Sequence, residues 1–242
     1  MISCLIVNLN CLQHTKNLIQ NLENQNLEDF EIFVADQNST EEGTEEFLEN
    51  IQQKHIVIRH GYNKPLNHIW NWFIKVARHD YCAFLNNDII IPKNFLKDTV
   101  EIFEKEPDVS CVIHPTNHPS WNTAKSTLEY TILDEKIRQG WDFSFRKKDW
   151  VHIPDVLEFY CGDDFIFENL YRKNKKVAMA LSSPIIHLLS QTRKSSLNKV
   201  IPNRNPTKDI ENYKKLGFDH YLDIPHKYSK IEPQITEIIE LS

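Results

Sequence analysis

Hydrophobic and polar positions follow two regular patterns over the first 114 residues. Short apolar runs rich in β-branched residues are typical of buried strands, and they alternate with segments whose apolar residues recur at helical spacing. The predicted strands span residues 2–9, 30–35, 56–59, 81–85 and 109–114, and the predicted helices span residues 14–26, 42–53, 67–78 and 92–104. This alternation predicts an α/β fold, with a mainly parallel central sheet flanked by helices on both faces.

The pattern becomes irregular after Pro115. The later predicted elements are strands at 128–133, 141–145 and 177–181, a helix at 164–173 and an amphipathic segment at 207–216. We therefore predict one domain over residues 1–195, built from a first half at 1–114 and a smaller mixed half at 115–195. Residues 196–242 are expected to form a C-terminal loop and helical tail.

Composition narrows the possible functions. Neither a GxGxxG nor a GxxxxGK[ST] motif is present, and the net charge of −6 argues against tight non-specific binding to nucleic acid. No apolar run reaches the roughly 18 residues that a membrane span needs, and the chain opens without a signal-peptide pattern. The five cysteines show no CxxC spacing, which is typical of reduced thiols. We expect a cytoplasmic protein without an integral membrane segment.

Polar residues follow each of the first four predicted strands. They are Asn8, Asn10, Asp36, Asn38, Asn63, Asn86, Asn87 and Asp88. A turn explains any one of them, but ligands of an open parallel sheet bind beyond the carboxyl ends of its strands. Four such ends in register therefore predict a polar site at one edge of the sheet.

Two carboxylates in this group suggest particular contacts. Asp36 can accept a hydrogen bond from a base imide or a ribose hydroxyl, and Ser39 or Thr40 after it is expected to cap the next helix. Asp88 can share a divalent cation with the oxygens of a diphosphate. The amides of Asn86 and Asn87 can contact ribose and phosphate without adding negative charge.

Four segments carry a resemblance to a known family. They are VADQNSTEEGT, GYNKPLNHIWNWFIKVARHDYCAFLNNDIIIP, YCGDDFIFENLYRKNKKVAMA and IIHLLSQTRK, in this order. Their order and spacing resemble family 2 glycosyltransferases of the GT-A fold over roughly residues 1–195. The resemblance implies a three-layer fold and an inverting sugar transfer from a nucleotide-diphosphate donor, dependent on a divalent metal such as Mn²⁺ or Mg²⁺.

The resemblance also implies roles for individual residues. Asp36 stands where the family contacts the nucleotide base, and Asn71 stands near the nucleotide. Asn86, Asn87 and Asp88 occupy the position of the family's DxD motif, with Asp88 as the metal ligand. This chain has an amide where the motif has its first acid, so modest metal affinity is expected.

The later segments supply the remaining implied residues. Asp163 and Asp164 resemble the acidic pair ahead of the acceptor-side helix, in which the second carboxylate is the general base. His187 resembles a histidine near the metal and the diphosphate. Helix capping by the acidic pair and a structural histidine are the alternative interpretations. Arg193, with Lys194, is a candidate to neutralise the leaving diphosphate.

Aromatic residues offer candidate acceptor contacts. Trp121, in a polar loop, is the better candidate, whereas Trp141 at the start of a predicted strand is expected in the core. A glycan or glycoconjugate is the expected acceptor, with a modified DNA base as a minority alternative. Two other functions stay open: a nucleotidyltransferase on a similar sheet, and a nucleotide-sugar or carbohydrate-binding protein with weakened catalysis.

Overall fold

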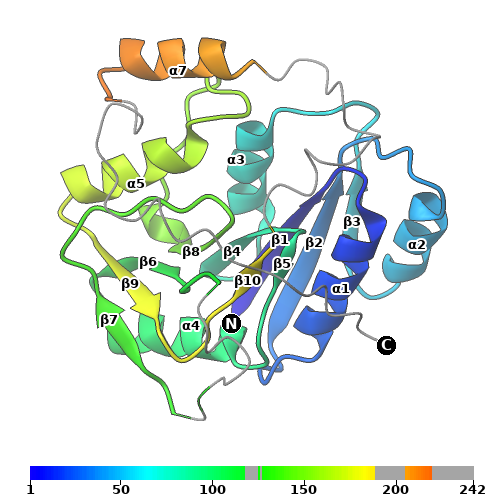
Figure 1. Ribbon diagram of the computed structural model, residues 1–242, viewed down its shortest axis with the longest axis horizontal. Helices are drawn as coiled ribbons and strands as arrows, with labels where there is room; N and C mark the ends of the chain where they lie inside the picture. The colour runs from blue at the N-terminus through cyan, green and yellow to red at the C-terminus, as the bar shows by residue number, and fades with distance from the viewer. Residues whose placement is uncertain (118–124, 126, 189–204, 220–242) are drawn as a thin grey trace.

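The first half of the chain folds as the predicted alternation of strands and helices (Figure 1). The computed structural model describes residues 1–117, 125, 127–188 and 205–219. Its first elements are β1 (Ile2–Asn8), α1 (Leu12–Glu23), β2 (Phe30–Asp36), α2 (Thr44–Ile51), β3 (Ile56–Arg59), α3 (Leu66–Val76), β4 (Tyr81–Asn86), β5 (Ile89–Ile90), α4 (Phe95–Lys105) and β6 (Val109–Ile113).

The second half adds shorter elements. They are β7 (Tyr130–Ile132), β8 (Asp142–Arg146), the 3₁₀ turn η1 (Lys147–Asp149), α5 (Gly162–Arg172), β9 (Lys176–Ala180), β10 (Ile186–His187) and α7 (Pro206–Lys215). Eight strands form one sheet in the order β3-β2-β1-β4-β8-β6-β9-β7. β8 and β7 run antiparallel to their neighbours and the remaining pairs are parallel, so the predicted mainly parallel sheet is confirmed.

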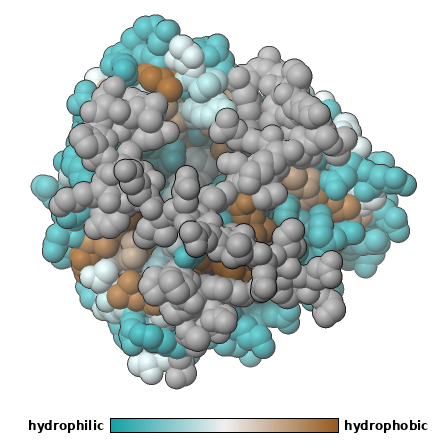
Figure 2. Space-filling model, in the orientation of Figure 1, coloured by the Kyte–Doolittle hydropathy of each residue, from teal (hydrophilic) through white to brown (hydrophobic). Residues whose placement is uncertain are grey.

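Helices cover both faces of the sheet, as the apolar strands require. On one face, α1, α2 and α4 bury residues such as Leu18, Leu48 and Phe95 against the strands. On the other face, α3 and α5 bury residues such as Phe73 and Phe167. The glutamate-rich outer side of α2 lies in a hydrophilic area in Figure 2. The result is the expected three-layer arrangement.

Two short strands build a second sheet beside the main one. β5 and β10 are antiparallel, and Ile89 is paired with His187. This pairing brings residue 187 next to residue 88, across about a hundred positions of sequence. It has no counterpart in the predicted elements, because strands of two residues leave no detectable periodicity.

Some predicted element boundaries were wrong. Neither Ser39 nor Thr40 caps α2: the helix begins after Gly43, whose backbone is left-handed, and Ser39 binds Asp36 instead. α4 begins at Phe95, three residues after the proline that was expected to open it. Within the described ranges, no helix has the length and apolar character to cross a bilayer.

Candidate active site

The carboxyl ends of β1, β2 and β4 are joined by a chain of buried hydrogen bonds. The Asn87 amide donates to the Thr15 hydroxyl (3.1 Å), the Thr15 hydroxyl to Asn8 Oδ1 (2.6 Å), and Asn8 Nδ2 to Asp36 Oδ1 (2.7 Å). Parallel pairing sets Asn8 beside Asp36 and thereby allows these contacts. All four side chains are buried, so the polar edge is a rigid platform and not a set of loose turns.

The loops after β1 and β2 are tied to each other. Asp36 accepts hydrogen bonds from the backbone N–H of Ser39 (3.1 Å) and from its hydroxyl (2.5 Å). Asn10 Oδ1 accepts from the N–H groups of Thr40 (2.8 Å) and Glu41 (3.0 Å), and its own backbone is left-handed at φ 55°. An asparagine adopts this conformation more readily than most residues. Asp36 is therefore held in place by protein donors on both of its oxygens.

Asp88 and His187 face one another across the small second sheet. His187 Nε2 lies 3.3 Å from Asp88 Oδ1, and both side chains are largely buried. His187 Nδ1 is buried without a hydrogen-bond partner among the described residues. Carboxylate oxygens suit Mn²⁺, imidazole is a common metal ligand, and two ligands about 2.1 Å from one ion at a right angle lie about 3 Å apart. The pair therefore fits the implied metal.

The described residues contain no group of three or more His, Cys, Asp or Glu side chains arranged to hold a metal. A site with two protein ligands must take its other ligands from elsewhere, and a diphosphate can supply them. That Asp88 shares its cation with the donor stays a prediction.

The histidine is oriented by an aromatic ring and an amide. The His187 ring stacks on Trp141, with ring centroids 5.2 Å apart and an angle of 19° between the planes. The backbone N–H of His187 donates to Asn117 Oδ1 (2.9 Å), and the indole N–H of Trp141 donates to the Thr116 hydroxyl (2.8 Å). Trp141, which was expected in the core, is half-buried and packs against the core cluster that contains Leu18 and Phe95, and its ring also lies beside the candidate metal ligands.

The acidic pair lies in the first turn of α5. Asp164 is buried, and its Oδ1 is 3.3 Å from the guanidinium of Arg138. Burial raises the pKa of Asp164, and the charge of Arg138 opposes this rise. Burial and the neighbouring charge of Asp164 raise the pKa of Asp163 to about 7. The helix begins at Gly162, and the residue before it, Cys161, makes no side-chain cap hydrogen bond. Hydrogen bonds from the backbone N–H groups of Asp163 and Asp164 lower the pKa of Asp163, so a capping role for Asp163 stays open.

Segment 138–141 joins the acidic pair to the histidine. Arg138 contacts Asp164, and a Cβ atom built on Gly140 would lie 2.4 Å from Asp163 Oδ2, so a larger residue there would require the Asp163 carboxylate to shift. The next residue, Trp141, stacks on His187. The Trp141 carbonyl accepts the Asn86 N–H at 2.9 Å, which fixes the segment at the end of β4.

The remaining candidate site residues from the sequence lie in different surroundings. Asn38 is exposed and left-handed (φ 62°), and Asn63 Nδ2 is buried without a partner among the described residues. The Asn71 side chain is bound to backbone: Nδ2 donates to the carbonyl of Ile153 (2.8 Å), and Oδ1 accepts from its N–H (3.0 Å). Arg193, Lys194 and Trp121 lie outside the described residues.

Sequence reasoning missed several residues of this edge. Arg138 and Gly140 were not selected, although the run RQG directly precedes the predicted strand at 141–145 and its glycine is typical of a turn. Gln37, which follows Asp36, is 2 % exposed and finds no hydrogen-bond partner within the described ranges for either amide atom. Buried amides without partners are rare, so Gln37 is available to a ligand at the end of β2.

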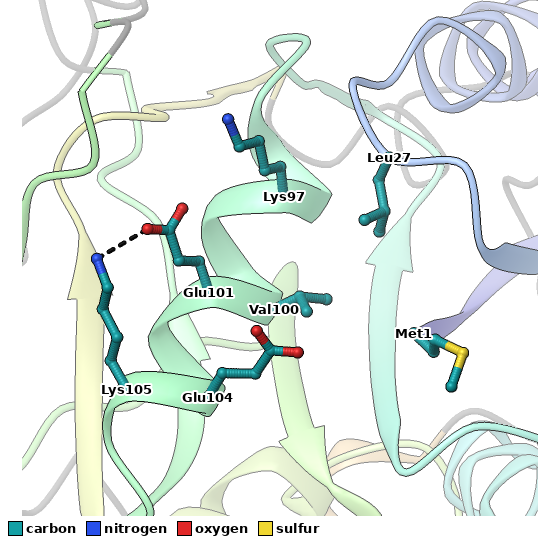
Figure 3. Close-up of a pocket in the computed structure, with 7 residues that line it drawn as sticks. All are labelled: Met1, Leu27, Lys97, Val100, Glu101, Glu104 and Lys105. Carbon is teal, nitrogen blue, oxygen red and sulfur yellow. Dashed lines mark hydrogen bonds and ion pairs between the residues drawn. The ribbon is translucent and has the colours of Figure 1, made fainter.

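A shallow pocket elsewhere in the molecule is separate from this edge. It lies beside α4, where Met1, Leu27 and Val100 form its apolar part and Glu101 pairs with Lys105 at its side (Figure 3). Met1 precedes the first residue of β1, whereas the candidate site lies at the carboxyl end of that strand. The pocket is thus at the opposite edge of the sheet.

The fold and the arrangement at the sheet edge define a GT-A type of α/β protein. The sequence model described as glycosyl transferase family 2 matches residues 3–169, and the chain belongs to this family. A comparison with curated protein sequences gives no significant match.

Solved structures share the fold at low sequence identity. S. aureus TarS 1–349 in complex with UDP-GlcNAc is 16 % identical with a TM-score of 0.67, covering 89 % of this chain and 65 % of that chain. The mannosyltransferase PcManGT from Pyrobaculum calidifontis, in complex with GDP-Man and Mn²⁺, is 14 % identical with a TM-score of 0.60, covering 78 % and 57 % respectively. This chain therefore spans less than two thirds of either neighbour.

Proposed function

We propose that this protein transfers a sugar from a nucleotide-diphosphate donor to an acceptor hydroxyl, with inversion at the anomeric carbon. One observation carries the proposal: segment 138–141 contacts both the Asp163–Asp164 pair and His187, which faces Asp88. This shared segment supports a proton acceptor near the place proposed for the diphosphate. Displacement of a diphosphate by a hydroxyl needs both. The nucleotide-sugars bound to TarS and PcManGT agree with such a donor.

Asp164 is the proposed general base. The acceptor oxygen forms a bond to the anomeric carbon as the bond from that carbon to the diphosphate breaks. The hydroxyl proton passes to Asp164 Oδ2, because Oδ1 is engaged by Arg138. Burial raises the pKa of Asp164 and makes it a stronger base, while Arg138 limits the rise and favours the ionised form. The products are the glycosylated acceptor and the nucleoside diphosphate.

The donor is proposed to lie along the carboxyl ends of β1, β2 and β4. In this proposal, Asp36 and the Gln37 amide, which has no partner among the described residues, contact the nucleoside at the end of β2, and Asn86, the last residue of β4, contacts the diphosphate. A divalent cation, when bound by Asp88 and His187, would supply positive charge to the departing diphosphate. A glycan or glycoconjugate is the proposed acceptor.

The assignment of the base is tested with Asp164→Asn. The wild-type chain is incubated with manganese and a panel of uridine, guanosine, cytidine and thymidine diphospho-sugars, and release of the nucleoside diphosphate is followed. We expect the variant to lose this release while it keeps its melting temperature and its nucleotide affinity. Asp155→Asn is the matched control, because that carboxylate is 80 % exposed. Near wild-type turnover by Asp164→Asn would refute the role of Asp164.

The metal assignment is tested with Asp88→Ala. Calorimetry of nucleoside diphosphate binding is carried out with and without manganese. We expect the gain in affinity from manganese to be lost in the variant, because one of two protein ligands is gone. The backbone contact from Leu188 N–H to the Asp88 carbonyl (2.9 Å) does not need the side chain, so the fold should persist. An unchanged response to manganese would count against the site.

A further inference from the structure

A buried carboxylate on α7 holds the loop that leads into the acidic pair. Asp209 is 1 % exposed and accepts hydrogen bonds from three successive backbone N–H groups. The donors are Glu158 (3.0 Å), Phe159 (2.8 Å) and Tyr160 (2.9 Å). Hydrogen bonds to a carboxylate are stronger than those to a neutral acceptor. Three of them fix the path of this loop across about fifty positions of sequence.

The opposite side of the same loop is held by α3. Asn67 Nδ2 donates to the carbonyls of Leu157 (3.0 Å) and Tyr160 (3.1 Å), and the Asn67 N–H donates to the carbonyl of Glu158 (3.0 Å). The loop is therefore clamped: its N–H groups point to α7 and its carbonyls point to α3. In Figure 1, α7 (orange) lies above both α3 and α5.

The clamped loop ends at the acidic pair. Tyr160 is followed by Cys161, whose left-handed backbone (φ 59°) turns the chain into α5, and Asp163 and Asp164 lie in the first turn of that helix. α7 also supports the far side of the pair. Phe165 meets the ring of Phe218 at 5.3 Å, and Phe218 stacks on the fully buried Tyr213 of α7 at 5.1 Å.

Burying an ionised carboxylate has a large desolvation cost, and an apolar side chain would fill the same space without it. The first turn of α7 stabilises this carboxylate through the helix dipole, and among the described residues its side-chain hydrogen bonds come from the N–H groups of the loop. These three bonds make the carboxylate a determinant of the geometry of the loop. We propose that Asp209 is a positioning residue for the Asp163–Asp164 pair, and that α7 belongs to the catalytic unit. This inference rests on the proposed function, in which Asp164 accepts the acceptor's proton.

The test compares a graded series of variants in the full chain. Asp209→Asn keeps one acceptor oxygen, whereas Asp209→Ala keeps none. Lys208→Ala is the matched control, because it removes only the exposed ion pair to Glu158 (2.7 Å) from the same helix and loop. Two quantities are measured: amide hydrogen exchange of the peptide covering residues 157–164, and kcat and KM for the donor.

We expect exchange in this peptide to be fastest in Asp209→Ala, intermediate in Asp209→Asn and unchanged in Lys208→Ala. We expect kcat to fall in the same order, by about 10- to 100-fold in Asp209→Ala, because a displacement of about 1 Å suffices for that loss. KM for the donor should change by less than about twofold, since the donor lies along the strand ends.

Three results would overturn the proposal: unchanged exchange, faster exchange with unchanged kcat, or a loss of kcat that only follows the fraction of unfolded chain. The last is identified by circular dichroism at the assay temperature. A wild-type chain that turns over no donor would refute the proposed function instead. The exchange series would in that case still decide whether Asp209 holds the loop.

Discussion

Gly162 lies against the side chain of Asn67, and we therefore predict that alanine at position 162 destabilises the protein. A Cβ atom built on Gly162 would lie 2.0 Å from Oδ1, 2.5 Å from Cγ and 2.9 Å from Nδ2 of Asn67. All three distances are far shorter than a normal van der Waals contact. Asn67 is 1 % exposed and binds two loop carbonyls, so it has no empty space into which to move.

Two effects of the Gly162→Ala substitution oppose each other. Alanine favours a helix over glycine by up to about 1 kcal/mol. Against this, displacement of Asn67 leaves buried carbonyls without a donor, at about 1–3 kcal/mol each, and the overpacked alternative costs about 1–3 kcal/mol. Less the helix gain, the loss of unfolding free energy is about 1–5 kcal/mol if both carbonyls lose their donor, and up to about 2 kcal/mol if the site is overpacked. The folded variant adopts the less costly of the two arrangements, so we expect a loss of about 1–2 kcal/mol, which lowers the melting temperature of a chain of this size by about 2–8 °C.

Denaturant titration and calorimetry measure this loss, with Gly61→Ala as the matched control. A Cβ atom at Gly61 meets no heavy atom within 4 Å, so a change of less than about 1 kcal/mol is expected there. A double-mutant cycle identifies the cause: with Asn67→Ala already in place, Gly162→Ala should cost less than about 1 kcal/mol. Equal stability of the two glycine variants would refute this account of the clamp.

Two further predictions concern the charges of the acidic pair. The pKa of Asp163 is raised to about 7. Between the ordinary carboxyl pKa and pH 7, the folded state therefore binds more protons than the unfolded state. The free energy of unfolding falls as the pH rises through this window. Asp163→Asn should therefore be more stable than the wild type by about 1–3 kcal/mol at pH 8.5, and by less at pH 4.5. Denaturant titrations that give equal gains at both pH values would contradict this prediction. Arg138 opposes the raised pKa of Asp164, so Arg138→Gln should move the acidic limb of the pH profile of kcat/KM to higher pH, and an unmoved limb would show that another group controls it.

Much of the fold could be predicted from local patterns. Periods of two and of three to four residues report which side of an element is buried, and the alternation in the first half therefore identified the helices and strands. The polar residues at the strand ends were visible for the same reason, since each follows an apolar run. Asn8 and Asp36 do lie side by side, because parallel pairing puts the carboxyl ends of neighbouring strands at one edge.

Contacts between distant segments could not be predicted in this way. β8 is inserted antiparallel between β4 and β6, which places Trp141 beside Asn86 and His187, yet nothing local distinguishes this strand from one at a sheet edge. Likewise, Asp209 carries the ordinary signal of a charged residue on an amphipathic helix. Only the folded chain shows that it is buried against the loop N–H groups.

By itself, the sequence determined the α/β class, the polar edge of the sheet and the resemblance to the family, because periodicity and motif order are properties of the linear chain. The tertiary structure decided the order of the strands, the meeting of Asp88 with His187, and the clamp of α3 and α7 on the loop before Asp163. These depend on which surfaces exclude water together and on which buried polar groups find partners. Both are settled by packing across the whole chain and not by any one segment.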